Sequence, residues 1–354
     1  MTLFFKDRSS SYKSSVAVVI LAAMAALLAP SCAYIDSVLK LFKPKVAEEQ
    51  PREPVVFKSD GYVIYRIEGK ETPASLAAQF LGNANRSWVI EDANKGITFE
   101  RDQIVIIPRK QPNKGGLTPT GYQTVPILCY HRFAEECKSY LCTPTPVFEQ
   151  QMKYLKDNNY RVISLGELLG FLNYLHPLPE RSVAITIDDG YRSAYDVAYP
   201  ILKKYGFRGT LFIYTNYVGI SKAAITWDQL RELKAAGFEV GSHTVSHCDL
   251  TKMKDGEDDQ AYLARIKEEL LVSKRIIDRE LRQDTIYIAY PYSRYNERIL
   301  HLAHKVGYKL GVSVERGGNP FFADPLTLKR NSIIKKDMNT FISSLKRFKR
   351  FSLQ

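Results

Sequence analysis

Two short runs of this chain combine residue types that can hold a metal ion and move a proton. The first is an apolar run that ends in the adjacent carboxylates Asp188 and Asp189, and the second places His243 and His247 four residues apart. Two histidines and one carboxylate form a common catalytic ligand set for zinc or iron, with positions left open for water and substrate. The remaining carboxylate is then free to act as a general base.

The elements that must position these side chains are predicted strands. Both runs follow strand-like segments, 183–188 and 238–241, so the side chains are expected to meet at one edge of a sheet. Adjacent strand residues point to opposite sides, which predicts different roles for Asp188 and Asp189. On one helical turn, the spacing of His243 and His247 aims both rings at a common point. Each run alone is typical of a turn or a helix face, and their combination favours a functional site.

A third short run completes a set of motifs: Thr186-Ile-Asp-Asp-Gly190, Ser242-His-Thr-Val-Ser-His247 and Ala289-Tyr-Pro-Tyr292. Over residues 125 to 335 the chain resembles the polysaccharide deacetylases of the NodB-homology type, carbohydrate esterase family 4. The resemblance implies that Asp188 is the general base and that Asp189, His243 and His247 bind a divalent metal. Zinc is the expected ion, with cobalt, nickel or iron as alternatives. The implied reaction is a metal-assisted hydrolysis that releases acetate and leaves a free amine.

Two features of that family are missing. The third motif often carries an arginine that steadies the base, and this chain has none there. The late Leu-x-His, the usual source of the general acid, would fall at 326–331, which holds no histidine. The run ending in His131 resembles the exopolysaccharide deacetylase subgroup, whose barrel elements are circularly rearranged, and this implies His131 as the acid. A capped strand end is the alternative for His131. Tyr292 is expected to offer its backbone amide to the oxyanion, or else to be a turn residue.

The first 32 residues are predicted to be an export signal. Basic residues precede the uncharged run Val16 to Ala29, which is short for a membrane span and is followed by small residues. The segment Leu28 to Cys32 resembles a bacterial lipobox, so Cys32 is a candidate for lipidation. Simple cleavage and an uncleaved anchor remain alternatives. We therefore expect an exported protein of the cell envelope, anchored to a membrane as a lipoprotein and facing the periplasm or the exterior.

Three further regions follow residues 33 to 58, which are predicted to be a linker. Residues 59 to 110 have a β-α-α-β order that resembles the lysin motif (LysM), a small binder of N-acetylglucosamine-containing glycans, and a structural α+β cap is the alternative. A Pro/Gly-rich linker spans 111 to 124. Strands and helices alternate over 125 to 354, which predicts an α/β fold. The resemblance implies a distorted (β/α) barrel for this catalytic domain.

Cysteine usage and charge agree with export. Cys137 and Cys142 flank a short loop and could pair in an oxidising compartment. Cys248 is expected to pack as a small apolar residue rather than bind metal. The net charge of +12 and the basic run 346 to 350, expected to end a solvated helix, suggest attraction to anionic membrane or wall polymers. Nucleic acid is not expected as a partner of an exported protein.

The leading hypothesis is a metal-dependent hydrolase acting on linear amides other than peptide bonds. Its expected substrate is an N-acetylglucosamine-containing polysaccharide, either peptidoglycan or poly-N-acetylglucosamine. The LysM resemblance favours a β-1,4 linkage, whereas the segment at His131 favours a β-1,6 linkage. O-acetyl ester hydrolysis and a non-catalytic glycan-binding lipoprotein are the alternatives. Asp188 speaks against the second, because a purely structural metal site needs no spare carboxylate.

Overall fold

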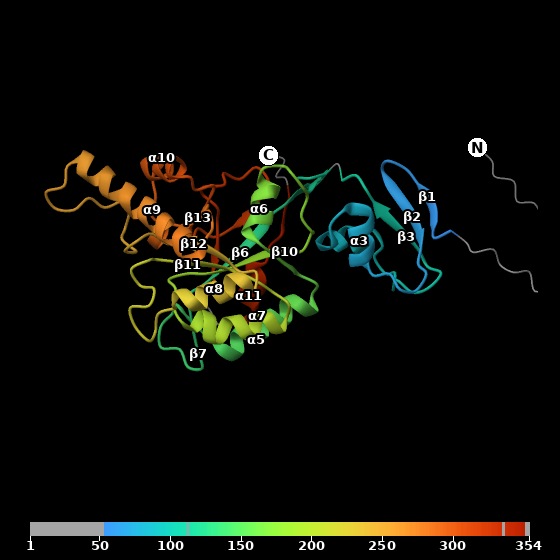
Figure 1. Cartoon of the computed structure of the whole chain (residues 1–354), viewed down its shortest axis with the longest axis horizontal. Coiled ribbons are helices and arrows are strands. Elements are labelled where there is room, and N and C mark those ends of the chain that lie inside the picture. Colours follow the sequence, from blue (N-terminus) through green and yellow to red (C-terminus); the bar gives the residue numbers. More distant parts are fainter. Residues whose placement is uncertain (1–52, 112, 335–336, 351–354) are drawn as a thin grey trace, which may run out of the picture. The chain divides into compact units, whose positions relative to one another are not determined.

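The computed structural model describes residues 53–111, 113–334 and 337–350 (Figure 1). The predicted export signal, the lipidation site at Cys32 and most of the first linker lie outside these ranges and stay predictions. Within the described residues, we find no helix with the length and apolar character needed to cross a membrane.

A three-stranded antiparallel sheet and two helices make up the first described region. The sheet has the order β1-β2-β3, and its elements are β1 (Val55–Lys58), β2 (Tyr62–Arg66), α3 (Pro73–Leu81), α4 (Ser87–Ala93) and β3 (Ile104–Pro108). Thr72 and Ser75 form a reciprocal cap at the start of α3, where Pro73 suits the first turn. Alternate residues of β2 and β3 are buried in a core shared with the helices. The likeness of this region to LysM stays a prediction.

A curved, mainly parallel sheet forms the second region, and the predicted α/β class is confirmed. Six parallel strands run in the spatial order β14-β13-β12-β11-β10-β6: β6 (Val125–Tyr130), β10 (Ser182–Ile187), β11 (Thr210–Ile213), β12 (Glu239–Ser242), β13 (Tyr287–Ala289) and β14 (Leu310–Val312). The smaller strands β9 (Arg161–Ile163), β15 (Gly318–Asn319) and β16 (Asn331–Ser332) add to β10 or β6. Strands β6 and β10 are buried along their whole length, as expected for a parallel sheet covered on both faces.

Helices connect these strands and bury both faces of the sheet. They are α5 (Thr145–Asp157), α6 (Leu165–Leu172), α7 (Tyr199–Lys204), α8 (Trp227–Ala235), α9 (Asp259–Leu281), α10 (Glu297–Val306) and α11 (Met338–Ser344). Figure 1 shows α5, α7 and α8 grouped on one side, where their apolar residues share one core with β10 and β11. Helix α6 contributes to a separate core with β6 and β14. Helix α9 buries one face, which is formed by Tyr262, Ile266, Leu270, Ser273, Ile277 and Leu281.

The irregular segment 325–333 joins the two edges of this sheet. Leu328 pairs with Val312 of β14, while Asn331 and Ser332 of β16 pair with β6. The backbone of Arg330 lies between these two attachments, and its side chain is 1% exposed. The segment that lacks the late histidine motif therefore closes the gap between β14 and β6 and brings an arginine into the interior.

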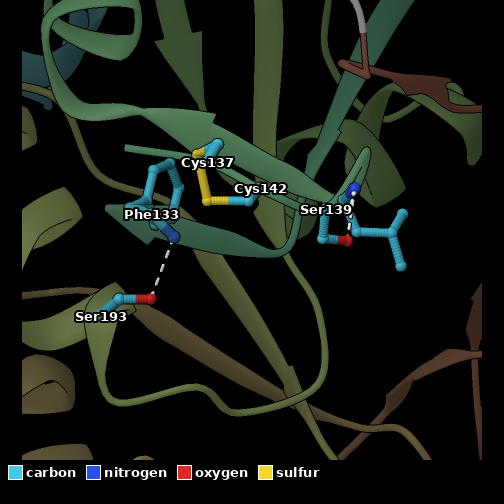
Figure 2. Close-up of a disulfide and its surroundings, with 6 residues drawn as sticks. Phe133, Cys137, Ser139, Cys142 and Ser193 are labelled. Atoms are coloured by element: carbon cyan, nitrogen blue, oxygen red, sulfur yellow. Dashed lines mark hydrogen bonds between the residues drawn. A yellow bond between two sulfur atoms is a disulfide. The ribbon is translucent and has the colours of Figure 1, made fainter. Parts of the chain in front are cut away.

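Short strands complete the fold at both ends of the catalytic region. Strands β4 (Leu117–Thr118), β5 (Gly121–Gln123) and β17 (Phe348–Arg350) form an antiparallel sheet. The prediction of a terminal helix for the basic run was wrong, because this run pairs with β5 through its backbone. Strands β7 (Arg132–Ala134) and β8 (Cys142–Pro144) pair beside the end of β6. Cys137 and Cys142, which the sequence left open as a pair, form a disulfide that closes the loop between them (Figure 2).

Candidate active site

The site lies where the parallel strands end. Asp188, His243 and His131 are the first residues after β10, β12 and β6, so the sheet brings together side chains that are far apart in the sequence. This is the edge at which α/β proteins of this kind place their reactive groups. The edge predicted from the sequence is therefore confirmed.

Asp188 is buried and paired with an arginine. Its carboxylate accepts two hydrogen bonds from the Arg330 guanidinium, at 2.7 and 2.6 Å, and the Cys129 thiol lies 3.5 Å from Oδ2. Burial alone would raise the pKa of Asp188, but the charge and hydrogen bonds of Arg330 outweigh it and hold the pKa below its ordinary value. Asp188 is therefore an ionised acceptor with a fixed orientation.

Arg330 is the functional residue that sequence reasoning missed. Besides Asp188, it donates to the Ser313 carbonyl at 2.8 Å and to the Thr186 hydroxyl at 3.0 Å. The arginine expected by resemblance belongs to the third motif, whereas this one comes from 326–331, the segment of the missing histidine motif. The signal available in the sequence was an arginine that alternates with Leu328 in a strand-like run.

Asp189, His243 and His247 converge on a common point, as the sequence predicts. Asp189 Oδ1 lies 3.5 Å from His243 Nε2 and 3.4 Å from His247 Nε2. This buried oxygen forms no hydrogen bond in the described residues. Ligand bonds of about 2.0–2.2 Å in a tetrahedral site separate neighbouring ligand atoms by roughly 3.3–3.6 Å. The spacing of the three residues therefore fits a divalent metal, and such an ion would satisfy the buried Oδ1 of Asp189.

The two histidines converge through a loop, so the predicted helical turn was wrong. After β12 the backbone takes positive φ at Thr244 (73°) and His247 (60°), which folds the loop back on itself. Non-glycine residues adopt this region only where surrounding contacts compensate the strain. Those contacts include the Thr244 carbonyl accepting from the Thr215 amide at 3.1 Å and the Thr244 hydroxyl accepting from the His247 amide at 3.0 Å.

Glu269 of α9 holds the middle of this loop. Its Oε2 accepts hydrogen bonds from the backbone amides of Val245 and Ser246, both at 3.0 Å, and its Oε1 accepts from the Ser246 hydroxyl at 2.7 Å. A charged acceptor makes such bonds stronger than neutral ones. Glu269 thus fixes the backbone between His243 and His247 without touching either ring.

Each histidine ring has a partner on its other nitrogen. His243 Nδ1–H donates to the Ala289 carbonyl at 2.8 Å, which directs the lone pair of Nε2 toward Asp189. His247 Nδ1 lies 3.2 Å from the Tyr292 hydroxyl, and the two rings are in edge contact. Tyr292 thus reaches the site through its side chain, a contact that the sequence did not suggest. The backbone role predicted for Tyr292 stays a prediction.

His131 lies beside Asp188 and Cys129, and the nearest ligand atoms of the three are within 4.8 Å of one another. Burial lowers the pKa of His131, although Asp188 and Asp189 pull it upward, so the neutral imidazole is the favoured form near pH 7. A second metal site here is disfavoured because Arg330 already occupies both oxygens of Asp188. Cys248, as expected, packs with the apolar residues under α9 and α10.

Comparison with known proteins agrees with this architecture. Residues 176–311 match the family model described as polysaccharide deacetylase. The chain is 36% identical over 193 residues to YxkH of Bacillus subtilis (strain 168), itself only provisionally named a polysaccharide deacetylase, covering 54% of this chain and 65% of that protein. It is 33% identical over 187 residues to the poly-β-1,6-N-acetyl-D-glucosamine N-deacetylase of Staphylococcus aureus (strain MRSA252), covering 51% and 64%. The chain thus spans just under two thirds of the length of these relatives.

Solved protein structures also resemble this chain. The Streptococcus pyogenes deacetylase PplD, in complex with acetate, aligns with a TM-score of 0.58 at 30% identity, over 64% of this chain and 100% of PplD. IcaB from Ammonifex degensii aligns with a TM-score of 0.57 at 24% identity, over 63% and 97%, and supports the fold alone. The fold and the arrangement of the site define an α/β protein of the deacetylase type. The chain belongs to the polysaccharide deacetylase family.

Removal of the Arg330 side chain should destabilise the fold, because it leaves the buried Asp188 carboxylate unpaired. We expect Arg330→Met to lower the free energy of unfolding by about 3–5 kcal/mol, because Asp188 loses its partner. The double variant Arg330→Met/Asp188→Asn should recover most of this loss, since no buried charge remains. Urea denaturation of both single variants and the double variant measures the coupling. Additive effects of the two substitutions would contradict the pairing.

Glu269 can be tested through metal affinity. We expect Glu269→Ala to weaken zinc binding by about 10–100-fold, because the loop that carries His243 and His247 loses its anchor. Glu268→Ala, an exposed neighbour on the same helix, is the matched control. Competition against a chromophoric chelator gives the zinc dissociation constant, and thermal denaturation of the apo forms separates an effect on the loop from unfolding. Equal zinc affinity in the two variants would show that Glu269 does not organise the site.

Proposed function

We propose that this chain is an exported, metal-dependent N-deacetylase that removes acetyl groups from N-acetylglucosamine units of a cell-wall or extracellular polysaccharide. The observation that carries the proposal is the division of labour between two adjacent carboxylates. Arg330 holds Asp188 ionised as a proton acceptor, whereas Asp189 faces two imidazoles and leaves an oxygen without a hydrogen bond. A site that only binds sugar has no need of this arrangement.

Asp189, His243 and His247 would hold a divalent ion, zinc being the expected one, with cobalt, nickel or iron as alternatives. When bound, such an ion supplies an activated water and polarises the acetamide carbonyl. Asp188 accepts the proton of the attacking water, and its pair with Arg330 keeps the accepting carboxylate in place. The backbone amide of Tyr292 is proposed to donate to the oxyanion of the tetrahedral intermediate.

The departing amine nitrogen needs a proton, and His131 is placed to deliver it. Burial lowers the pKa of His131 and favours its neutral form, so the imidazole would relay a proton rather than start the reaction already protonated. It would take a proton on one ring nitrogen from Asp188 and give one from the other nitrogen to the amine. His131 would thus fill the role of the histidine missing from 326–331.

The same proposal includes glycan binding by the N-terminal region, attachment to a membrane and the linkage of the polymer. Residues 59–110 would hold the glycan, and a lipid on Cys32 would attach the chain to a membrane. The name of the Staphylococcus aureus relative supports a β-1,6-linked polymer, poly-N-acetylglucosamine. The resemblance of residues 59–110 to LysM supports a β-1,4-linked one such as peptidoglycan.

Acetate release tests the function and selects the linkage. We expect the zinc-loaded fragment 33–354 to release acetate from N-acetylglucosamine oligomers of one linkage, β-1,4 or β-1,6, and a chelator to abolish the release. Asp188→Asn, which keeps the size of the side chain, should lower kcat by at least about 100-fold because the proton acceptor is lost. His131→Ala should lower kcat by a similar factor.

Three other outcomes would contradict the proposed function or the roles of Asp188 and His131. Absence of release from both linkages by folded, metal-loaded protein would favour an O-acetyl esterase or a glycan-binding protein. Release by Asp188→Asn at the wild-type rate would refute the base assignment, and an unchanged His131→Ala would refute the proton carrier.

A further inference from the structure

A cationic cavity of about 340 Å³ lies next to the candidate active site. Its lining includes Arg132, which follows His131, and Arg192, which follows the Asp188-Asp189 run by three residues. Lys222 is the third cation and Asp196 is the acid in the lining. The segments that carry His131 and the two aspartates therefore continue into the wall of this cavity.

Contacts between backbone and side chains hold the cavity wall in place. The Phe133 amide donates to the Ser193 hydroxyl at 3.0 Å, which joins β7 to the loop that follows the two aspartates (Figure 2). On the opposite side, the Arg192 amide donates to the Ala223 carbonyl at 2.8 Å. The disulfide between Cys137 and Cys142 closes the loop between β7 and its partner strand β8. The three cations are thus carried by segments tied to one another.

The cavity has an excess of positive charge. Arg192 pairs with Asp196 at 3.0 Å, and Arg132 lies over the Tyr191 ring at 6.0 Å. In the described part of the chain, neither Arg132 nor Lys222 forms a salt bridge with a carboxylate. Two cations with no acidic partner on the rim of one cavity attract an anion.

A row of aromatic rings connects this cavity to the ligand set. Starting from His247, successive ring centres are 5.3 Å apart to Tyr214, 5.1 Å to Tyr217 and 5.6 Å to Tyr191. Arg132 then lies over the last ring. Such a wall offers flat apolar faces together with polar hydroxyls, which suits a sugar chain. A polymer lying along it would place a neighbouring unit at the cavity while one unit is at the metal ligands.

We propose that this cavity binds an anionic substituent, a carboxylate or a phosphate, on a sugar near the one that is deacetylated. The inference rests on the proposed function and narrows its substrate class from any N-acetylglucosamine polymer to one that carries negative charge. The guanidinium of Arg132 provides a forked donor for either anion, and Lys222 adds a point charge.

Probes that differ only in charge test this inference. The full-length chain in detergent, loaded with zinc, is given an N-acetylglucosamine oligomer of the active linkage that carries one succinyl group. The methyl ester of the succinyl group gives the same oligomer without the charge. An oligomer that carries a phosphate instead shows which of the two anions the cavity prefers. We expect kcat/KM for the succinylated oligomer to exceed that for the ester by about fivefold at low salt, and the ratio to shrink as salt is added.

A charge reversal supplies the decisive variant. Lys222→Glu should bring the ratio of kcat/KM for the succinylated oligomer to kcat/KM for its ester to one or below. The control is Lys267→Glu, which makes the same change in net charge at an exposed position of α9 away from the cavity and should preserve the ratio. Isothermal titration with both oligomers gives the same comparison for binding, independent of turnover. Equal affinity for the charged and the neutral oligomer, or equal effects of the two reversals, would overturn the inference. A preference in binding without any acetate release would instead count against the proposed function.

Discussion

The ion pair between Asp188 and Arg330 is the contact on which the rest of the site depends. Burying two charges is costly, and the cost is offset here because both oxygens of the carboxylate and all three nitrogens of the guanidinium find partners. The pair also joins the end of β10 to the segment that links β14 with β6. The interaction that keeps Asp188 ionised therefore also stabilises the closure of the sheet. If Asp188 is the base, as we propose, stability and proton transfer should change together in variants of this pair.

This pair separates the roles of two adjacent carboxylates. Because Arg330 engages Asp188 on both oxygens, the neighbouring Asp189 is left to face His243 and His247. The loop from β12 completes the ligand set only because strained residues are held by Glu269 and by the loop after β11. The two adjacent aspartates thus have different partners. The expected alternation of strand side chains is not the cause, because β10 ends at Ile187 and Asp189 adopts a positive φ of 74° in the turn that follows.

Local sequence predicted the strands and the convergence of Asp189, His243 and His247 but could not supply their tertiary partners. The strands ending at Asp188 and His243 were recognisable from short apolar runs, and the α/β class followed from their alternation with helices. The partner of Asp188 lies 142 residues away. The alternation of Arg330 with Leu328 indicates a strand-like segment but not the group that the arginine meets, so only the folded sheet reveals the pair. The spacing of His243 and His247 predicted convergence correctly, but the helical turn was wrong because loop contacts override local preference.

The most direct test is a crystal structure of the zinc-loaded protein with anomalous diffraction at the zinc edge. We expect one zinc peak bound by Asp189 Oδ1 and by Nε2 of His243 and His247, with Asp188 still paired to Arg330. A peak bound by Asp188, or by Cys129 and His131, would contradict the division of labour between the two carboxylates. It would also remove the physical basis for treating Asp188 as the base.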